Sequence, residues 1–255
     1  LIFVETSVQI ERVLADKSEK IKLENHFERL STQLYTTNYV WMEFQRTIVA
    51  DVAHIQRVMS TQYGWGDLMV NLLIGQRAFR PRSAVRCTQM LGHLHNQSNG
   101  NWRYARLLLE QLIQERFKRQ FWTNVNPLSD LITCDLVTKG VSRTSSGDYT
   151  VAATCNKETA ACFLPNFIEQ NLDKLRILDA YLTAHTKAIK DQARVQRLLT
   201  TVIDNPQAVL GQNSCWPLGD IIIALQVPDG ASVWTLDADF EPIVEALGLS
   251  LYTTE

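Results

Sequence analysis

The chain has 255 residues, a formal net charge of −2 and 45% apolar residues, which is typical of one large or two modest globular domains. A charge this close to zero gives the molecule no general attraction for polyanions, so any contact with nucleic acid must come from a local patch. No apolar run approaches the roughly 18–20 residues of a membrane span, and we expect no contact with a membrane.

The first 58 residues alternate between short apolar strands and helices. Strands are predicted at 1–4 and 34–37, and helices at 5–16, 18–32 and 38–58. This alternation favours an α/β fold with parallel strands. The C-terminal end repeats the pattern, with a helix at 219–227, a strand at 232–236, a helix at 241–248 and a strand at 249–252.

The middle of the chain has a different pattern. Residues 66–122 and 165–202 are predicted to be helical, and weak alternation around the turn sequence SSGD (145–148) predicts a β-hairpin within 130–155. The simplest account is an α/β core formed by 1–58 and 205–255, with a mostly helical insertion at 59–204.

Five scattered cysteines, without any C-x-x-C pair, suit a reducing compartment, so we expect a cytoplasmic protein. Cys134, Cys155 and Cys162 could form a zinc site, but they lie further apart than ligand pairs usually do. Buried structural thiols are the simpler interpretation.

Two carboxylates in the N-terminal region occupy unusual positions. Glu5 follows the first predicted strand directly, and in open parallel sheets ligands bind beyond such strand ends. Glu43 falls on the apolar stripe of helix 38–58, where a lone carboxylate is costly unless it is paired or bound to a metal. Glu5 could equally be a turn acid, and Glu43 could pair with Arg46. Asp51, two turns further along, is expected at the solvated edge of the helix.

Three aspartates near the C-terminus take similar positions. Asp220 opens the apolar helix GDIIIAL, and Asp237 ends the strand in VWTLDADF, two residues before Asp239. Taken alone, Asp220 is a common first-turn helix acid and Asp237 a common turn residue. Asp237 is the better candidate for a site, and Asp239 is a supporting residue or a helix cap.

Considered together, these acidic residues indicate a site more strongly than any one of them does alone. If the strands are parallel, the acids lie at one edge of the sheet, where crowded carboxylates repel one another strongly at neutral pH. Divalent cations relieve that repulsion, and oxygen ligands favour Mg²⁺ or Mn²⁺ over zinc. Such clusters are suited to activating water against a phosphodiester.

Four motifs, in order, resemble the PIN domain family: VETSV (4–8), YTTNYVWMEF (35–44), GDIIIAL (219–225) and VWTLDADF (233–240). They cover under half of the chain. The resemblance implies a Rossmann-like three-layer fold with a central parallel sheet, and metal-dependent cleavage of single-stranded RNA or, less often, DNA. It also implies an acidic tetrad at the metal, with Thr6 or Ser7 beside it; the tetrad comprises Glu5, Glu43, Asp220 and Asp237. Asp239 is a further candidate at the metal because of its position two residues after Asp237.

The chain departs from the family pattern in two ways. The first acid is usually aspartate, whereas Glu5 carries an extra methylene and reaches about 1.5 Å further. Most family members are also far shorter, so residues 59–204 need their own explanation.

The insertion is locally basic. Residues 76–119 carry nine basic and two acidic side chains, interleaved with aromatic residues on which bases could stack. A second basic row is predicted to form one stripe of a helix. A protein interface or a plain solvated surface are the alternatives to nucleic-acid contact. The candidate contacts are Arg77, Arg80, Arg82, Arg86, Lys187, Lys190, Arg194 and Arg197.

Two functions are therefore expected from the sequence. The first is a Mg²⁺- or Mn²⁺-dependent endoribonuclease, for which a toxin with an antitoxin partner is one biological setting. The second is a catalytically weak or inactive scaffold on the same fold, which binds RNA or a protein partner. Either protein could form a homo-oligomer.

Overall fold

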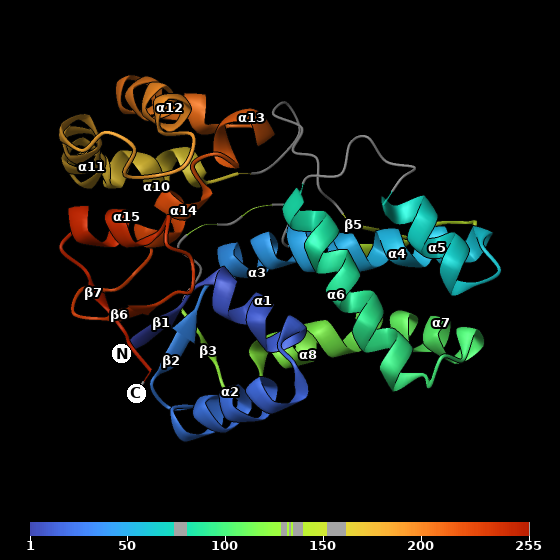
Figure 1. Ribbon diagram of the computed structural model, residues 1–255. Coiled ribbons are helices and arrows are strands. Elements are labelled where there is room, and N and C mark those ends of the chain that lie inside the picture. The colour runs from blue at the N-terminus through green and yellow to red at the C-terminus, as the bar shows by residue number, and fades with distance from the viewer. Residues whose placement is uncertain (74–80, 129–131, 133, 135–139, 152–161, 255) are drawn as a thin grey trace.

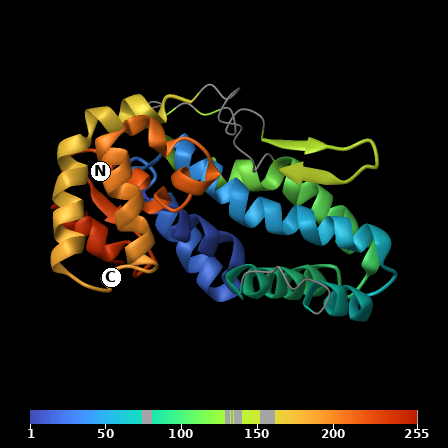
Figure 2. The ribbon, with the colours of Figure 1, turned by 90° about the horizontal axis from the view of Figure 1, so that it is seen from above.

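Figure 1 shows the computed structural model of the chain, which describes all residues except 74–80, 129–131, 133, 135–139, 152–161 and 255. A parallel sheet covered by helices lies at one end, and a group of further helices extends away from it (Figures 1 and 2). The predicted α/β class is therefore confirmed. Within the described residues, no helix is both long and apolar enough to cross a membrane.

The sheet has five strands, and each pairing between neighbours is parallel. Their order in the sheet is β3-β2-β1-β6-β7. The chain therefore adds β2 and β3 on one side of β1, and then crosses back to add β6 and β7 on the opposite side of β1. The direction of winding reverses between β1 and β6, which is where open parallel sheets bind ligands. The strands are β1 (Ile2–Val4), β2 (Leu34–Thr36), β3 (Asn126–Pro127), β6 (Ser232–Trp234) and β7 (Ser250–Leu251).

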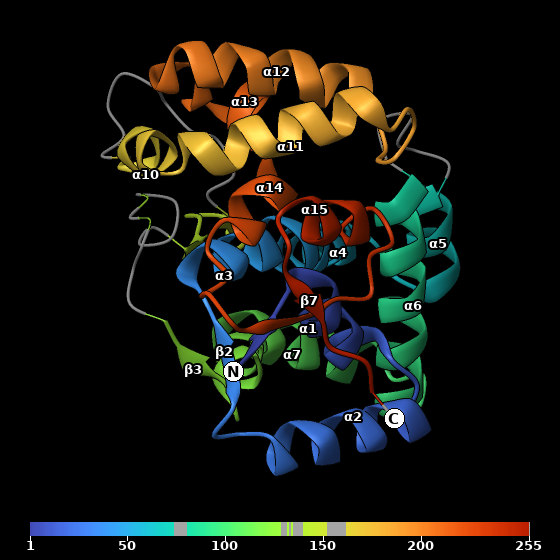
Figure 3. The same cartoon turned by 90° about the vertical axis from the view of Figure 1, so that its left-hand side faces the viewer.

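Both faces of the sheet are covered, which explains why its strands read as continuous apolar runs. Ile2 and Val4 of β1 pack into one hydrophobic cluster with Phe27 of α2 (Lys17–Arg29). Phe3 points to the opposite face and joins the main cluster, together with residues of α14 (Gly219–Ala224) and α15 (Glu241–Ala246). Figure 3 shows α2 below the sheet and α14 and α15 above it.

Helix α1 (Thr6–Leu14) follows β1 directly, as predicted. The predicted helix at 38–58 is also confirmed, although it extends further and contains a π-helical turn. Its parts are α3 (Asn38–Phe44), η1 (Gln45–Val49) and α4 (Ala50–Thr61).

The helices that extend from the sheet include four α-helices and a second π-helical turn, and the predicted β-hairpin packs against α4 (Figure 2). They share the main hydrophobic cluster with the sheet, because it contains Phe3 of β1 and Leu94 of α6. These elements are α5 (Trp65–Leu73), α6 (Pro81–Gln97), α7 (Trp102–Gln111), η2 (Leu112–Arg116), α8 (Phe117–Trp122), β4 (Val141–Arg143) and β5 (Tyr149–Val151).

The prediction that residues 165–202 are helical is confirmed for most of this range, but the helix expected to carry a basic stripe from 187 to 197 is interrupted. A loop at 185–191 separates two of the three helices found there, and Lys187 and Asp191 in it have φ values of 63° and 53°. Residues with positive φ cannot continue a right-handed helix. The elements here are α10 (Leu164–Gln170), α11 (Leu172–Ala184), α12 (Gln192–Asp204), η3 (Pro206–Val209) and α13 (Gln212–Cys215).

Strand β3 lies within the range expected to be an insertion, yet it pairs with β2 at the edge of the sheet. It has only two residues, including a proline, which edge strands tolerate because one side of the strand needs no hydrogen bond. Cys134 and Cys162 face each other in an isolated antiparallel bridge, while Cys155 lies outside the described residues.

Candidate active site at the carboxyl edge of the sheet

A cleft of about 530 Å³ opens beyond the carboxyl ends of β1 and β6, at the point where the direction of winding reverses. Six acidic side chains and three basic ones line it, which leaves a formal charge of −3. The basic residues are Arg86, Lys190 and Arg194. The acidic residues are Glu5, Glu43, Asp191, Asp220, Asp237 and Asp239.

Glu5 lies at the floor of the cleft and is only 3% exposed. Its carboxylate caps α1 by accepting the Ser7 N–H at 2.8 Å, and it also accepts the Ser7 hydroxyl and, at 3.1 Å, the Thr235 hydroxyl. Burial, and then repulsion by Glu43, raise the pKa of Glu5 to about 7, although the hydrogen bonds from Ser7 and Thr235 oppose the shift. Glu5 is therefore both a helix cap and a member of the acid cluster.

Glu43 reaches the cleft from α3, and its side chain is 18% exposed. Its Oε2 accepts the Thr6 hydroxyl at 2.5 Å, and its Oε1 lies 3.9 Å from Nη2 of Arg46. The start of α14 approaches so closely that a Cβ on Gly219 would lie 3.3 Å from Oε1. The expected alternative, pairing of Glu43 with Arg46, is thus present but long, and Glu43 still faces the other acids.

Asp220 lies in the first turn of α14, as its position before the apolar run predicts. Burial raises its pKa well above the ordinary value, and the carboxylates of Glu43, Glu5, Asp237 and Asp239 raise it further, in that order. Four acidic neighbours that all act on one carboxyl group show that these residues converge in space.

Asp237 and Asp239 follow β6 in a series of tight turns. The Asp237 N–H donates to the Thr235 hydroxyl at 3.0 Å, and the Asp239 N–H donates to Oδ1 of Asp237 at the same distance. Asp239 Oδ1 in turn accepts the backbone N–H of Lys190 at 3.2 Å. Asp239 therefore links the acid cluster to the loop between α11 and α12.

The donor chemistry of the cluster fits a divalent cation, because the acidic side chains offer only oxygen ligands, and burial together with the neighbouring carboxylates raises the pKa of Glu5 and of Asp220. Within the part of the chain that the structure describes, no three His, Cys, Asp or Glu side chains already form a coordination shell. Glu5 and Glu43 instead bind hydroxyl groups of Ser7, Thr235 and Thr6. Binding an ion therefore requires some of these carboxylates to move closer together.

Sequence reasoning missed two residues at or beside the cleft. Thr235 holds Glu5, and its position two residues before Asp237 was the available signal. Trp216 lines the cleft, and the guanidinium of Arg46 stacks on its ring at 4.8 Å. Arg46 Nη1 and Trp216 Nε1 are buried without a hydrogen-bond partner among the described residues, so both are donors that a ligand could satisfy.

The predicted basic contacts divide into four groups, the last of which is Arg86 alone. Lys190 and Arg194 are exposed and line the cleft, while Lys187 and Arg197 line a neighbouring hollow. Only two of these four lie in α12, so the single helical stripe is corrected to a loop followed by a helix. Arg77 and Arg80 lie outside the described residues, and Arg82 belongs to α6, although its side chain is not described.

Arg86 lines the cleft but is already paired, because its Nε lies 2.7 Å from Oδ2 of Asp51. Asp51 also accepts the Ser83 hydroxyl, and its side chain is only 13% exposed. The expectation of a solvated Asp51 is therefore wrong, since α6 packs over that side of α4 and supplies both partners.

No protein-family model, no curated protein and no solved structure matches this chain.

Proposed function

We propose that this protein is a Mg²⁺- or Mn²⁺-dependent endonuclease of the PIN type that hydrolyses single-stranded RNA. The observation that carries the proposal is the meeting of four acids in one cleft, from positions up to 232 residues apart in the sequence, 5 and 237. Buried carboxylates that lie close together repel one another and destabilise the fold. Such a cluster is therefore expected where it has a function, and not by chance.

The fold supports the same proposal. Counted along the chain, the five strands of the sheet take the order 3-2-1-4-5, and helices cover both faces, as expected for a three-layer, Rossmann-like PIN core. The acids stand at the switch point between β1 and β6, so the ordered motifs of the sequence correspond to one location in space.

In the proposed enzyme, Glu5, Glu43, Asp220 and Asp237 hold the ion, with Asp239 behind them. When bound, Mg²⁺ or Mn²⁺ supplies a Lewis acid that makes water a stronger nucleophile toward phosphorus. The protein's own groups orient the ligands.

Two hydroxyl groups do most of this orienting. Thr6 directs Glu43 through their 2.5 Å hydrogen bond, while Ser7 fixes Glu5 through its backbone N–H and its hydroxyl. Both residues belong to the first turn of α1, so the strand-to-helix junction positions the two acids together.

The substrate strand would lie along the basic wall of the cleft. Lys190 and Arg194 are exposed there and can bind the phosphates on either side of the scissile bond. Trp216 offers an aromatic surface for a base. DNA has the same backbone charge, so the choice of RNA rests on the family resemblance.

The test is cleavage of an end-labelled single-stranded RNA by the purified protein with Mn²⁺, and with EDTA in parallel. We expect metal-dependent cutting that Asp220→Asn abolishes, whereas Asp204→Asn, at the exposed end of α12, leaves it unchanged. Wild-type cleavage rates in both Asp220→Asn and Asp237→Asn would contradict the assignment.

A binding scaffold without nuclease activity is the second candidate. It is favoured by the hydrogen bonds that occupy Glu5 and Glu43, and by the lack of a ready coordination shell among the described residues. Calorimetric titration with Mn²⁺ separates the two candidates, because a scaffold of this kind would show no binding near millimolar concentrations. An antitoxin or other protein partner, a homo-oligomer and a cytoplasmic location stay predictions.

A further inference from the structure

A second hollow, of about 350 Å³, lies between α2 and α8 and shares no residue with the acid cleft. Its charge is opposite to that of the cleft. Four cations surround a single carboxylate, Glu24, so the formal charge is +3. The cations are Arg12, Lys20, Arg116 and Arg119.

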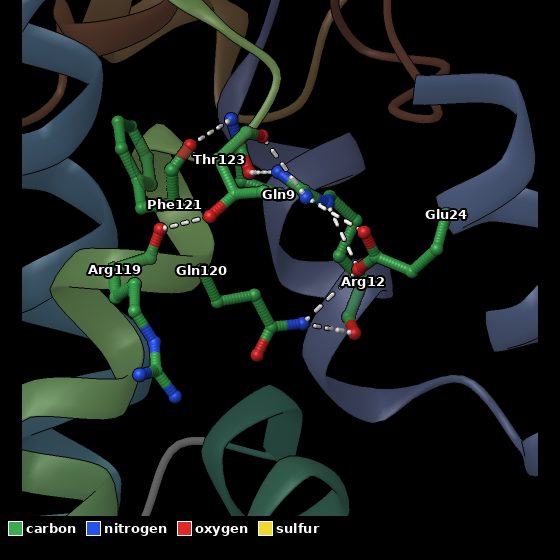
Figure 4. A network of polar contacts seen from close by, with 7 residues as sticks. All are labelled: Gln9, Arg12, Glu24, Arg119, Gln120, Phe121 and Thr123. Atoms are coloured by element: carbon green, nitrogen blue, oxygen red, sulfur yellow. Dashed lines mark hydrogen bonds and ion pairs between the residues drawn. The ribbon is translucent and has the colours of Figure 1, made fainter. Parts of the chain in front are cut away.

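The floor of this hollow is a closed network around Arg12, whose side chain is 0% exposed (Figure 4). Its guanidinium binds both oxygens of Glu24, at 2.9 and 3.3 Å, and also Oε1 of Gln9 and the carbonyl oxygen of Thr123. The ring of Phe27 lies 3.8 Å from the guanidinium carbon. Arg12 and Glu24 therefore neutralise each other, and the excess charge belongs to the other three cations.

Those three cations form no ion pair within the described part of the chain. Arg116 donates to the neutral Gln111 side chain at 2.9 Å. The Arg119 side chain extends away from the Arg12–Glu24 pair in Figure 4. Burial, opposed by Glu24 but supported by Arg12, lowers the pKa of Lys20, so its charge is held at a free-energy cost that an anion would offset.

An adjoining hollow of about 500 Å³ shares Arg119 and Thr123 with the first. It adds the exposed Lys118 and the half-buried ring of Trp122, together with Glu115. A cationic hollow that continues into an aromatic one offers, side by side, the groups that bind a backbone phosphate and the base next to it. Planar guanidinium groups and aromatic rings are the side chains that bind phosphates and bases in single strands.

We propose that this α2–α8 surface, formed by Lys20, Arg116, Lys118, Arg119 and Trp122, is a second binding site for single-stranded nucleic acid. One backbone phosphate is bound by Lys20, Arg116 and Arg119, and the adjoining base stacks on Trp122. The site needs no metal, and it rests on the proposed function only for the class of ligand. In an active enzyme it would hold a part of the strand remote from the bond that is cut.

The test is fluorescence anisotropy of a labelled 15-nucleotide oligouridylate with EDTA present, so that binding is measured without cleavage. We expect Arg119→Ala to raise Kd about fivefold and to reduce the slope of log K against log salt by up to about 0.7, the value for one phosphate contact, because Lys20 and Arg116 remain. Arg103→Ala, which removes an exposed arginine of α7, is the matched control and should change neither quantity.

Trp122 has a different expected signature. Trp122→Leu should raise Kd about tenfold without changing the salt slope, because a stacked base releases no counterion. Trp122→Phe, which keeps a ring, should recover most of the affinity, and thermal melting confirms that each variant folds. Unchanged binding in both Arg119→Ala and Trp122→Leu, or an equal loss in Arg103→Ala, would overturn the proposal.

An acidic peptide is the competing ligand. If a labelled polyglutamate of equal charge bound wild type more tightly than the oligonucleotide did, and Arg119→Ala abolished that binding, the surface would bind a protein and the proposal would be wrong. The result of this binding test can be distinguished from the result of the nuclease assay. Variant-sensitive binding in EDTA, together with no cleavage in Mn²⁺, would leave this site standing and reject the nuclease. Cleavage in Mn²⁺, with binding unchanged in both Arg119→Ala and Trp122→Leu, would do the reverse.

Discussion

The acid cleft and the Arg12 network both bury charged side chains, but they do so in opposite ways. Around Arg12, each charge meets an opposite charge or a hydrogen-bond acceptor, and Glu24 binds the guanidinium with both oxygens. In the cleft, Glu5 and Asp220 are buried and face further carboxylates, and burial first and then these neighbours raise their pKa values. The first arrangement stabilises the fold once formed, while the second destabilises it. That cost is typical of sites kept for function.

The largest expected effect comes from breaking the Arg12 network. Arg12→Ala leaves Glu24 without its partner and opens a cavity beside Phe27, so we expect a loss of about 3–5 kcal/mol in the free energy of unfolding. Urea denaturation measures it. Arg176→Ala, which breaks an exposed pair with Asp173, should cost less than about 1 kcal/mol. Similar losses in both variants would show that burial of the Arg12 pair is unimportant.

The second effect is a pH dependence that arises in the cleft alone. The pKa of Glu5 is about 7 in the folded protein and 4.5 without the fold, so the folded state binds the proton more tightly. Its contribution to stability is complete below about pH 4.5 and is lost as the pH rises through 7, by about 3 kcal/mol.

The measurement is urea denaturation of the metal-free protein from pH 5 to pH 8. Glu5→Gln cannot titrate, and the difference between wild type and this variant isolates the effect of Glu5 from that of Glu43 and Asp220 opposite it. A difference that stayed constant with pH would mean that Glu5 ionises normally.

Asp220→Asn should raise the free energy of unfolding, whereas Arg12→Ala lowers it. Removing one of several crowded carboxylates relieves repulsion, so we expect the metal-free protein to gain about 1–2 kcal/mol at pH 8. Thermal melting in EDTA measures this gain, and Asp204→Asn should stay within about 0.5 kcal/mol of wild type. Destabilisation by Asp220→Asn would indicate that its carboxylate is paired and would remove the contrast between the two sites.

The smallest effect concerns the contact between α14 and Glu43. In Gly219→Ala, a Cβ 3.3 Å from Oε1 forces the carboxylate to move, so Mn²⁺ binding should weaken a few-fold while stability changes by less than about 1 kcal/mol. Gly92→Ala in α6 is the matched control, because a Cβ added at Gly92 would have no neighbour within 4 Å from elsewhere in the described chain. Calorimetry compares the two, and equal Mn²⁺ affinities would show that the position of Glu43 is not critical.

Much of the α/β unit follows from local patterns. The apolar runs before Glu5 and Asp237 are strands, and the stripe that contains Glu43 is a helix, because strand and helix periodicity depends on neighbouring residues. The break at 185–191 was missed because Lys187 and Asp191 are not typical loop markers such as proline or glycine. Strand β3 has only two residues, which is too short for an alternation of apolar and polar residues to be recognised in the sequence.

The sequence by itself determined which residue types end each strand and begin each helix, and hence that acids stand at strand ends. Only the tertiary structure decided their partners. Pairing of β1 with β6 brings Thr235 to Glu5, and the packing of α6 on α4 neutralises Asp51 with Arg86. The electrostatics of a buried charge depend on neighbours that are distant in the chain, and these neighbours exist only once the helices and strands have packed.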